Sequence, residues 1–509
     1  MKEGRLHKSL INAKINLIFY FISLFIAFYS RKIFLNCLGS DFIGLTGTLN
    51  NILSFLNLAE LGIGVAVSFF LYKPILEKNT KEINDILSVL GYLYKKIGNG
   101  ILCTGIFISL FFPLIFRNTI FNYSIIYFAY YSFLASSLIG YFINYRQILL
   151  TANQKNYIVA IYTQTASIFK TILQIYLAYN YKNLYLWVGI ELIFSIIACI
   201  ILNYKIDKEY PWLKCDKQKG KILKTKYNHI IVSTKQIFIH KIKDFLLTRS
   251  DEIMVFAFVS LKMVAYYGNY TLIINKISML FNYALEGIGS GVGNLIAENN
   301  KKNIIKVFWE LMTIRHFIAG LVFTSLFFLL EPFITLWLGK EYILEKWILY
   351  LLLINIYIMQ SRGTVDMFNH AYGLYADTWS AWAELIINLG VTITIGYYLG
   401  IIGILLGKTL SLAFIVLWWK PQYLFSQGLK LPLKVFWNGN IRYYIIFIIS
   451  FVITIISSNY IKINPYLNWI SLITYSFIIV IIYITINITF LYYFSIGTKD
   501  LISRIRFYK

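Results

Sequence analysis

The sequence predicts an all-α polytopic membrane protein with about fourteen transmembrane helices, arranged as two pseudo-symmetric six-helix lobes followed by two C-terminal helices. Three observations support this fold class. Of the 509 residues, 58% are hydrophobic and only 14% are charged. Long apolar segments recur along the whole chain, and features of the first half return in the second half at a nearly constant spacing. A soluble protein of this length could not bury so much apolar surface.

Hydropathy divides the chain into fourteen expected spans joined mostly by short loops. The three longer connections, 73–96, 203–228 and 420–442, are all rich in lysine. The first span is expected to stay in the protein, because no small-residue cleavage site follows its basic start. The expected spans lie near residues 13–36, 42–71, 97–115, 123–145, 157–178, 183–203, 229–258, 264–296, 306–330, 346–362, 379–398, 400–419, 443–460 and 467–494.

The charge distribution predicts the orientation of these helices. The net charge is +24, which in a soluble chain would suggest nucleic-acid binding. Here the basic residues must first be placed relative to the membrane: roughly thirty lie on the side of the N-terminus and about eight on the other side. This asymmetry predicts that both termini are cytoplasmic, and we expect no nucleic-acid partner.

The span expected at 229–258 is unusually polar and could instead be an amphipathic helix on the membrane surface. Parity favours a span, because without it the basic loops 301–306 and 420–442 would lie outside. At 100° per residue, six of its polar side chains share one face, as in a helix that lines an aqueous cavity. They are Ser233, His240, Lys241, Asp244, Thr248 and Asp251.

The second span, within Asp41–Pro74, is predicted to be one long helix that carries polar groups inside the membrane. Asn50, Asn51 and Asn57 precede Glu60 on it, and glycines follow the acid. Because an unpaired polar side chain in hydrocarbon costs free energy, we expect Glu60 to face protein or water. Glycines on such a helix allow close approach of a neighbour, or bending.

Two pairs of segments indicate an internal duplication. Gly47 and Glu60-Leu-Gly-Ile-Gly are matched by Gly268 and Glu286-Gly-Ile-Gly. The segment from Arg146 to Gly189 is likewise matched by the one from Arg362 to Gly407. An even number of helices separates equivalent points, which predicts lobes of the same orientation. The expected divisions are an N-lobe at 1–203, a basic cytoplasmic linker at 204–228, a C-lobe at 229–419, and 420–509 with the last two helices and a basic tail.

One motif resembles a known family. It runs from Arg31 through Leu38-Gly39, Phe42-Ile-Gly-Leu and Leu58-Ala-Glu-Leu-Gly-Ile-Gly to Leu71-Tyr-Lys-Pro74. It is similar to the first two helices of bacterial polysaccharide flippases of the Wzx type, the O-antigen flippases of lipopolysaccharide biosynthesis. These belong to the MOP exporter superfamily with the multidrug and toxic-compound exporters (MATE).

The resemblance implies a MATE-like fold in the bacterial inner membrane. It also implies that a polyprenyl-diphosphate-linked oligosaccharide moves from the cytoplasmic to the outer leaflet by alternating access of the two lobes. Membrane lipids are expected partners, other polysaccharide-assembly proteins are candidate partners, and proton or sodium is a candidate coupling ion.

Intramembrane charge independently favours an anionic, hydrophilic cargo, because cations outnumber carboxylates in the spans and would make charge-assisted hydrogen bonds to a diphosphate. For several residues structural pairing is the alternative: Arg315 and His316 could pair with Glu310, and Lys408 with Glu384. The expected substrate-binding residues are Lys241, Arg249, Lys276, Lys170, Lys235, Arg315 and His240. The expected ion-coupling or inter-lobe seam residues are Glu60, Glu286, Asp244 and Asp251.

The sequence contains no motif typical of an enzyme. It has no P-loop, no GxGxxG after a strand, no HExxH and no cluster of Cys and His, so we expect no catalytic residue, no metal and no cofactor. The two alternative functions are a multidrug exporter of the same fold, whose cavity should be acidic or apolar, and a membrane polysaccharide polymerase. The polymerase is disfavoured because the longest outer loop, 331–346, is short and mostly apolar.

Overall fold

The structure, a computed structural model, describes most of the chain and is helical almost throughout. The described residues are 5–57, 63–117, 119–153, 155–228, 230–231, 250–286, 292, 295–296, 300–374 and 377–507. Within these ranges there is no β-strand, and ten helices are long and apolar enough to cross a membrane. The protein is therefore a polytopic, multi-pass membrane protein of all-α class.

The chain forms two compact units. Unit 1 comprises residues 1–256 and 260–265, and unit 2 comprises 257–259 and 266–509.

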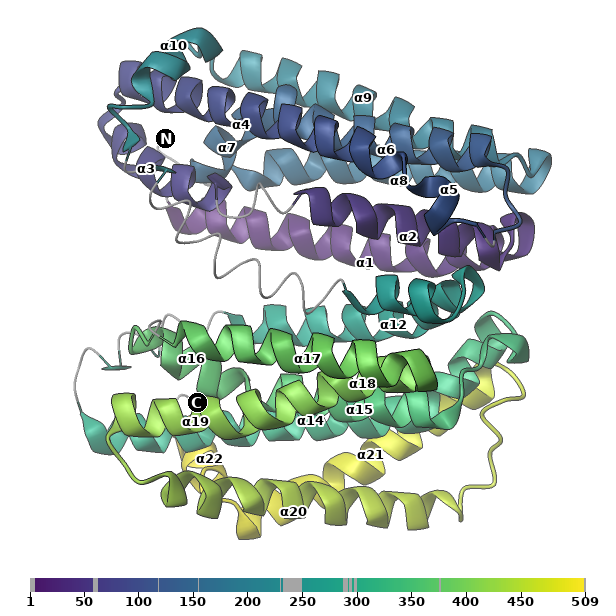
Figure 1. The fold of residues 1–509 in the computed structure, drawn as a ribbon. Coiled ribbons are helices and arrows are strands. Elements are labelled where there is room, and N and C mark those ends of the chain that lie inside the picture. Colours follow the sequence, from purple (N-terminus) through teal and green to yellow (C-terminus); the bar gives the residue numbers. More distant parts are fainter. Residues whose placement is uncertain are drawn as a thin grey trace. The chain divides into compact units, whose positions relative to one another are not determined.

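In unit 1, α1 packs along α8, α6 packs along α9 and α4, and α8 packs against α9 (Figure 1). A residual helical segment, 250–256, also belongs to this unit. Its elements are α1 (Arg5–Leu38), α2 (Ser40–Leu56), α3 (Ile63–Glu77), α4 (Thr80–Ser109), α5 (Phe112–Ile115), α6 (Tyr123–Phe142), the 3-10 turn η2 (Asn144–Arg146), α7 (Gln147–Ala152), α8 (Asn156–Tyr181), α9 (Leu184–Glu209) and α10 (Lys217–Leu223).

In unit 2, the long helix α14 is central and contacts α15, α20 and α21, while α17 packs along α18 (Figure 1). The first turn of α12 is counted with unit 1. The elements are α12 (Leu261–Glu286), α14 (Lys301–Trp337), η3 (Lys340–Tyr342), α15 (Lys346–Ser361), α16 (Gly363–Ala371), α17 (Thr378–Leu399), α18 (Ile401–Ser411), the π-helical η4 (Leu412–Trp419), α19 (Lys420–Tyr423), the π-helical η5 (Leu424–Leu429), α20 (Leu433–Ser458), α21 (Trp469–Phe494) and α22 (Thr498–Phe507).

Most expected spans coincide with these helices, but several boundaries were wrong. α4 starts at Thr80 instead of 97, because its first turns are amphipathic: Ile83, Leu87 and Leu90 are buried while charged residues between them lower the average hydropathy. The helix expected to end at 419 continues through η4, α19 and η5 to Leu429.

Two expectations about continuous helices fall partly outside the described residues. The second span appears as α2 and α3, and 58–62 between them is outside the description, including Glu60. Of the span expected at 229–258, residues 230–231 and 250–258 are described as helical, and 232–249 are not described.

The two units repeat the same order of elements. In unit 1, α4, α6, α7, α8 and α9 follow one another, and α14, α15, α16, α17 and α18 follow one another in unit 2. The first two and the last two helices of each series are in contact. In both series the second helix breaks at an arginine before a short helix: Arg146 ends η2, and Arg362 lies between α15 and α16. The observed helix breaks thus fall at the segment pair used to predict a duplication.

The basic segment 204–228, expected to be a linker, is folded onto unit 1. Its helix α10 packs on α4, and a Cβ at Gly220 would lie 2.0 Å from the carbonyl oxygen of Ser88. Lys219 on α10 pairs with buried Asp85 at 2.9 Å. The boundary between the lobes within this segment stays a prediction.

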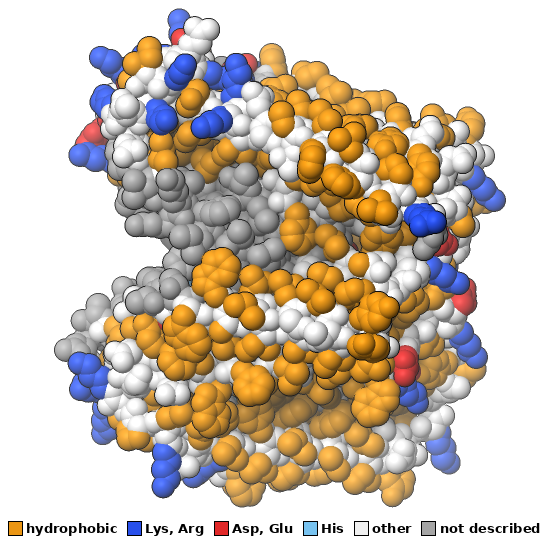
Figure 2. Space-filling model, in the orientation of Figure 1, with side chains coloured by type: hydrophobic (Ala, Val, Ile, Leu, Met, Phe, Trp, Pro, Cys, Tyr) orange, Lys and Arg blue, Asp and Glu red, His pale blue; other side chains and the backbone are white. Residues whose placement is uncertain are grey.

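The surface of each unit is apolar along its helices and charged at the helix ends. Figure 2 shows the Lys and Arg side chains of unit 1 gathered mainly around α10 and the start of α4, with hydrophobic side chains along the helices. On α9 and α20, isoleucines such as Ile200, Ile445 and Ile448 are exposed. Exposed aliphatic side chains of this kind are those that would face lipid.

Three residues of the family-like motif hold the first two helices and the start of α12 together within unit 1. Gly39 has φ +88°, a left-handed conformation that favours glycine, at the turn between α1 and α2. A Cβ at Gly44 would lie 1.9 Å from the carbonyl oxygen of Leu261, so the backbones touch there. Arg31 Nη2 donates to the carbonyl oxygen of Ala265 at 3.0 Å.

We predict that Gly44→Ala destabilises the protein, whereas Gly47→Ala does not. The added methyl group at Gly44 would collide with the Leu261 backbone, while at Gly47 the nearest atom, Val264 Cγ1, is 3.8 Å away. Overpacking of this kind costs about 1–3 kcal/mol. The measurement is the midpoint of thermal unfolding of the purified protein in detergent. It is monitored by size-exclusion chromatography with fluorescence detection after heating. Equal midpoints for the two variants would contradict this packing.

Candidate functional site

Only some of the expected site residues lie in the described part of the chain. Glu60 and residues 232–249 lie outside it. The latter include the expected ligands Lys235, His240, Lys241 and Arg249, and the expected seam residue Asp244. Glu286 ends α12, but its side chain is outside the description. The roles of these residues stay predictions, and the structure places Lys170, Lys276, Arg315 and Asp251.

Lys170 is paired within unit 1. Its Nζ lies 2.7 Å from Glu191 Oε1, which joins α8 to α9. Gln174, one turn further along α8, donates to Glu191 Oε2 at 3.3 Å and to the carbonyl oxygen of Trp187 at 3.0 Å. The charge of Lys170 is therefore compensated by Glu191, so an anionic cargo would have to compete with that carboxylate.

Arg315 differs from Lys170 in that it makes no hydrogen bond or ion pair with any described residue. It is half-buried on α14 and lies against the break between α15 and α16: a Cβ at Gly363 would be 2.5 Å from its Cζ. The alternative expected from sequence, pairing of Arg315 or His316 with Glu310, is wrong. Glu310 instead pairs with Arg504 of α22, at 2.9 Å.

His316 is held in a buried polar cluster of unit 2. Its Nε2 lies 2.9 Å from Asn440 Oδ1 on α20, and its Nδ1 lies 3.1 Å from the hydroxyl of Tyr357 on α15. The ring also stacks on Tyr443, with centroids 4.9 Å apart. Because the amide oxygen can accept a hydrogen bond from Nε2–H and the hydroxyl can donate one to Nδ1, these partners satisfy a neutral imidazole.

A carboxylate that the sequence reasoning overlooked lies beside the motif helix. Asn51 Nδ2 on α2 donates to Glu252 Oε2 at 2.5 Å. The neighbouring expected seam residue, Asp251, is buried in the same unit, with 4% of its surface exposed. Further along α2, Asn57 Oδ1 accepts hydrogen bonds from Ser137 and Tyr141 of α6. The asparagines that made the second span unusual thus bind partners within unit 1.

Lys276 lies half-buried on α12, in the part of that helix that belongs to unit 2. Its role as a cargo ligand stays a prediction. It is placed on a long helix and is partly exposed.

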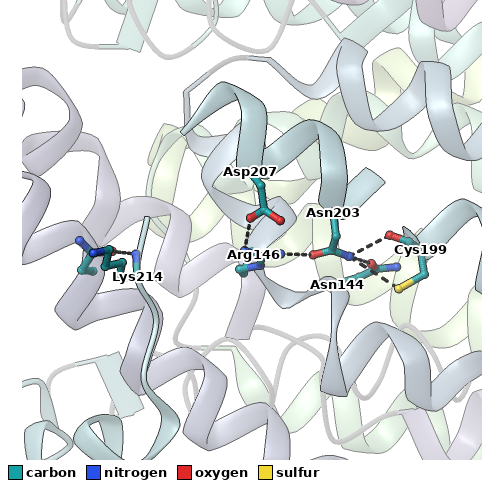
Figure 3. Close-up of polar contacts among 7 residues, drawn as sticks. Asn144, Arg146, Cys199, Asn203, Asp207 and Lys214 are labelled. Atoms are coloured by element: carbon teal, nitrogen blue, oxygen red, sulfur yellow. Dashed lines mark hydrogen bonds and ion pairs between the residues drawn. The ribbon is translucent and has the colours of Figure 1, made fainter. Parts of the chain in front are cut away.

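A polar network fastens the broken helix of unit 1 to α9. Figure 3 shows Arg146 in contact with two side chains of α9, those of Asp207 and Asn203. Its Nη1 lies 2.6 Å from Asp207 Oδ1, and its Nη2 donates to Asn203 Oδ1 at 2.7 Å. Asn203 in turn donates to Asn144 Oδ1 at 2.7 Å and to the carbonyl oxygen of Cys199. Arg146 is thus a positioning residue for the break after α6.

Each unit has an ion pair that joins the residue before its fourth repeated helix, α8 or α17, to the later part of the helical segment that follows, with opposite charge order. In unit 1, Lys155, directly before α8, pairs with Glu209 at the end of α9. In unit 2, Asp377, directly before α17, accepts from Lys420 Nζ at 2.9 Å and from Trp419 Nε1 at 2.9 Å. Sequence spacing gave no sign of these pairs, because the partners are more than forty positions apart.

No candidate metal site is found in the described residues, since no three His, Cys, Asp or Glu side chains are grouped there.

No protein-family model and no curated protein matches this sequence. Solved structures do match. The lipid II flippase MurJ, in an inward closed conformation, is 17% identical and aligns with a TM-score of 0.68 over 95% of this chain and 99% of its own. This chain has the fold of that flippase.

Two MATE transporters are also similar in structure. An inward-facing MATE family transporter of the MOP superfamily is 15% identical, with a TM-score of 0.56 over 79% of this chain and 94% of its own. A mutant of the Vibrio cholerae MATE transporter VcmN is 12% identical, with a TM-score of 0.51 over 83% of this chain and 99% of its own. The expected MATE-like fold is therefore confirmed.

We predict that the Asp377–Lys420 pair shows strong coupling in a double-mutant cycle. Lys420→Met leaves a buried carboxylate without its cation, and breaking a buried pair in this way costs about 3–5 kcal/mol. Asp377→Asn together with Lys420→Met should regain most of that stability. The measurement is thermal unfolding of the four proteins in detergent. Additive effects of the two substitutions would contradict the pairing.

We also predict that Cys215, in the segment between α9 and α10, reacts slowly with maleimides. Burial raises the pKa of its thiol to about 11, and the thiolate is the reactive form. At pH 7.5 a single-cysteine protein carrying Cys215 should react roughly a hundredfold more slowly than one with an exposed thiol, and its rate should rise about tenfold per pH unit.

The matched control for this measurement is Lys224→Cys in the same background, because Lys224 is exposed directly after α10. Equal labelling rates, measured by mass shift, would show that 210–216 does not pack against unit 1 as described.

Proposed function

We propose that this protein is a lipid flippase of the MOP superfamily. Its cargo is a polyprenyl-diphosphate-linked oligosaccharide, which moves from the cytoplasmic to the outer leaflet of the bacterial inner membrane by alternating access of the two lobes. The observation that carries the proposal is the extent of the structural likeness. The flippase aligns over 95% of this chain with a TM-score of 0.68, whereas the two MATE structures align over 79% and 83% with lower scores.

The charges of the spans favour the same class of cargo. A diphosphate needs cations that are not already neutralised by the protein, and Arg315 has no ion-pair partner among the described residues. We propose that Arg315 and Lys276 act with Lys235, His240, Lys241 and Arg249 as ligands, and that Lys170 contributes only when released from Glu191. An exporter of organic cations would instead require exposed carboxylates.

The carboxylates have a second proposed role. We assign Glu60, Glu286, Asp244 and Asp251 to ion coupling or to the seam between the lobes, with proton or sodium as the coupling ion. Buried carboxylates inside a membrane protein are typical of such roles. Asp251 supports the assignment because it is buried and directly precedes Glu252, the partner of Asn51.

The orientation and location are part of the proposal. We propose that both termini lie in the cytoplasm, which the excess of Lys and Arg on the side of the N-terminus favours. The family-like motif points to surface polysaccharide such as O-antigen as the pathway, with other polysaccharide-assembly proteins as partners.

We predict that Lys241→Glu or Arg249→Glu abolishes surface polysaccharide when the gene complements a flippase-deficient strain. Charge reversal in the cavity would repel the diphosphate, so cargo export should fall to background while protein level and membrane insertion stay normal. The matched control is Lys462→Glu, which makes the same change of charge on an exposed loop between α20 and α21. It should leave polysaccharide unchanged.

Normal polysaccharide in both cavity variants would contradict the basic-cavity mechanism. Failure of the unmodified protein to complement, together with increased resistance of the cells to cationic drugs, would favour a multidrug exporter.

A further inference from the structure

Unit 2 contains a cavity at the end where α14 begins, apart from the proposed cargo residues. Its volume is ≈ 300 Å³. The start of α14, the turn after α16 and the end of η5 form its walls. The lining residues are Ile296, Lys301, Ile304, Ile305, Tyr372, Gln427, Gly428, Leu429 and Lys430.

The polar groups of the cavity wall are positively charged or neutral. Lys301 and Lys430 make no hydrogen bond or ion pair with the described residues, and neither do the side chains of Tyr372 and Gln427. Among the residues that the structure describes, no carboxylate lines the cavity. Two ammonium groups without an ion pair to a described residue, beside a phenol hydroxyl and a carboxamide, are a set that favours a phosphate group, since every one of them can donate a hydrogen bond.

The backbone close to each of the two lysines is hydrogen-bonded. Asn300 caps α14 by accepting a hydrogen bond from the Asn303 amide at 3.2 Å, so Lys301 begins a helix of 37 residues. Lys430 adopts φ +53°, and the amide of Leu431 closes the end of η5 by bonding to the carbonyl oxygen of Phe425 at 2.8 Å. Lys430 therefore leaves the helix in a fixed direction.

The remaining wall is apolar. Ile304 and Leu429 are buried, while Ile296 and Ile305 pack partly exposed against the same core. Gly428 keeps the cavity open at the aromatic wall, because a Cβ there would lie 3.1 Å from Tyr372 Cδ2. A free inorganic phosphate has no apolar group to pack against this part of the wall. A phosphate that carries acyl chains does.

We propose that this cavity binds the headgroup of an anionic phospholipid of the membrane in which the protein resides. The two lysines bind the phosphate, Tyr372 and Gln427 bind its polar substituent, and the isoleucines contact the first methylene groups of the chains. Basic pockets between helices at a membrane surface commonly bind anionic headgroups. This site is additional to the proposed cargo site, and it would exist whether or not the protein is a flippase.

The test uses the full-length protein in lipid nanodiscs and photoreactive phospholipids. Phosphatidylglycerol and phosphatidylcholine that carry a diazirine near the headgroup are compared, and the adducts are located by peptide mass spectrometry. We expect phosphatidylglycerol adducts on the cavity segments 296–305 and 424–430, and few phosphatidylcholine adducts. Lys301→Gln with Lys430→Gln should reduce the phosphatidylglycerol adducts there roughly tenfold.

The matched control is Lys302→Gln with Lys434→Gln. These two lysines are exposed, and in the sequence they lie within four residues of Lys301 and Lys430, but they do not line the cavity. The control therefore removes the same charge from the same part of the chain. It should leave the adducts unchanged. An equal loss in the control, or equal labelling by phosphatidylcholine, would overturn the proposal, because either shows attraction without a specific headgroup site.

Two competitors identify the source of the phosphate. Unlabelled phosphatidylglycerol should displace the labelled lipid, whereas inorganic phosphate should not. Displacement by inorganic phosphate would overturn the assignment to a lipid. Displacement by polyprenyl phosphate alone would overturn it in favour of cargo. None of these measurements depends on transport, so failure of the flippase proposal in the complementation assay would leave their outcome intact.

Discussion

The low polarity of the membrane interior is the constraint on which the rest of this structure depends. A charged or amide side chain placed there must find a partner in the protein or reach water, because lipid offers neither. Lys170 with Glu191, Asn51 with Glu252 and the imidazole of His316 with its two partners all follow from this requirement. These contacts join different helices, so they also determine which helices lie side by side. Polar side chains thus form specific contacts between helices whose other surfaces are mostly apolar.

The order and class of the helices followed from hydropathy, because a membrane-spanning helix must be long and apolar wherever it lies in the sequence. Helix ends were predicted less well. The first turns of α4 are amphipathic and lie below the hydropathy of a span, and η4 and η5 extend a helix past its apolar part. Hydropathy averages cannot separate such extensions from loops.

The site was harder to predict, because each ionic partner depends on folding. Spacing along one helix suggested Glu310 as a partner for Arg315, but the carboxylate is taken by Arg504, 194 residues away. The repeat of Arg146 and Arg362 was visible in the sequence, yet its meaning as a helix break required the structure. The ion pairs Lys155–Glu209 and Asp377–Lys420 were not predicted for a similar reason. They occur at corresponding places in the two units, but the cation comes first in one pair and the carboxylate comes first in the other, so the sequences do not resemble each other there.

The pair between Glu310 and Arg504 also has a consequence for biosynthesis. Glu310 is 3% exposed, and its partner Arg504 is synthesised 194 residues later. At ordinary translation rates the interval between the two residues is roughly 10–40 s. During that time α14 is made with its buried carboxylate uncompensated, so this part of unit 2 can reach its final packing only after α22 has been synthesised. A chain interrupted before α22 would keep Glu310 buried without its cation.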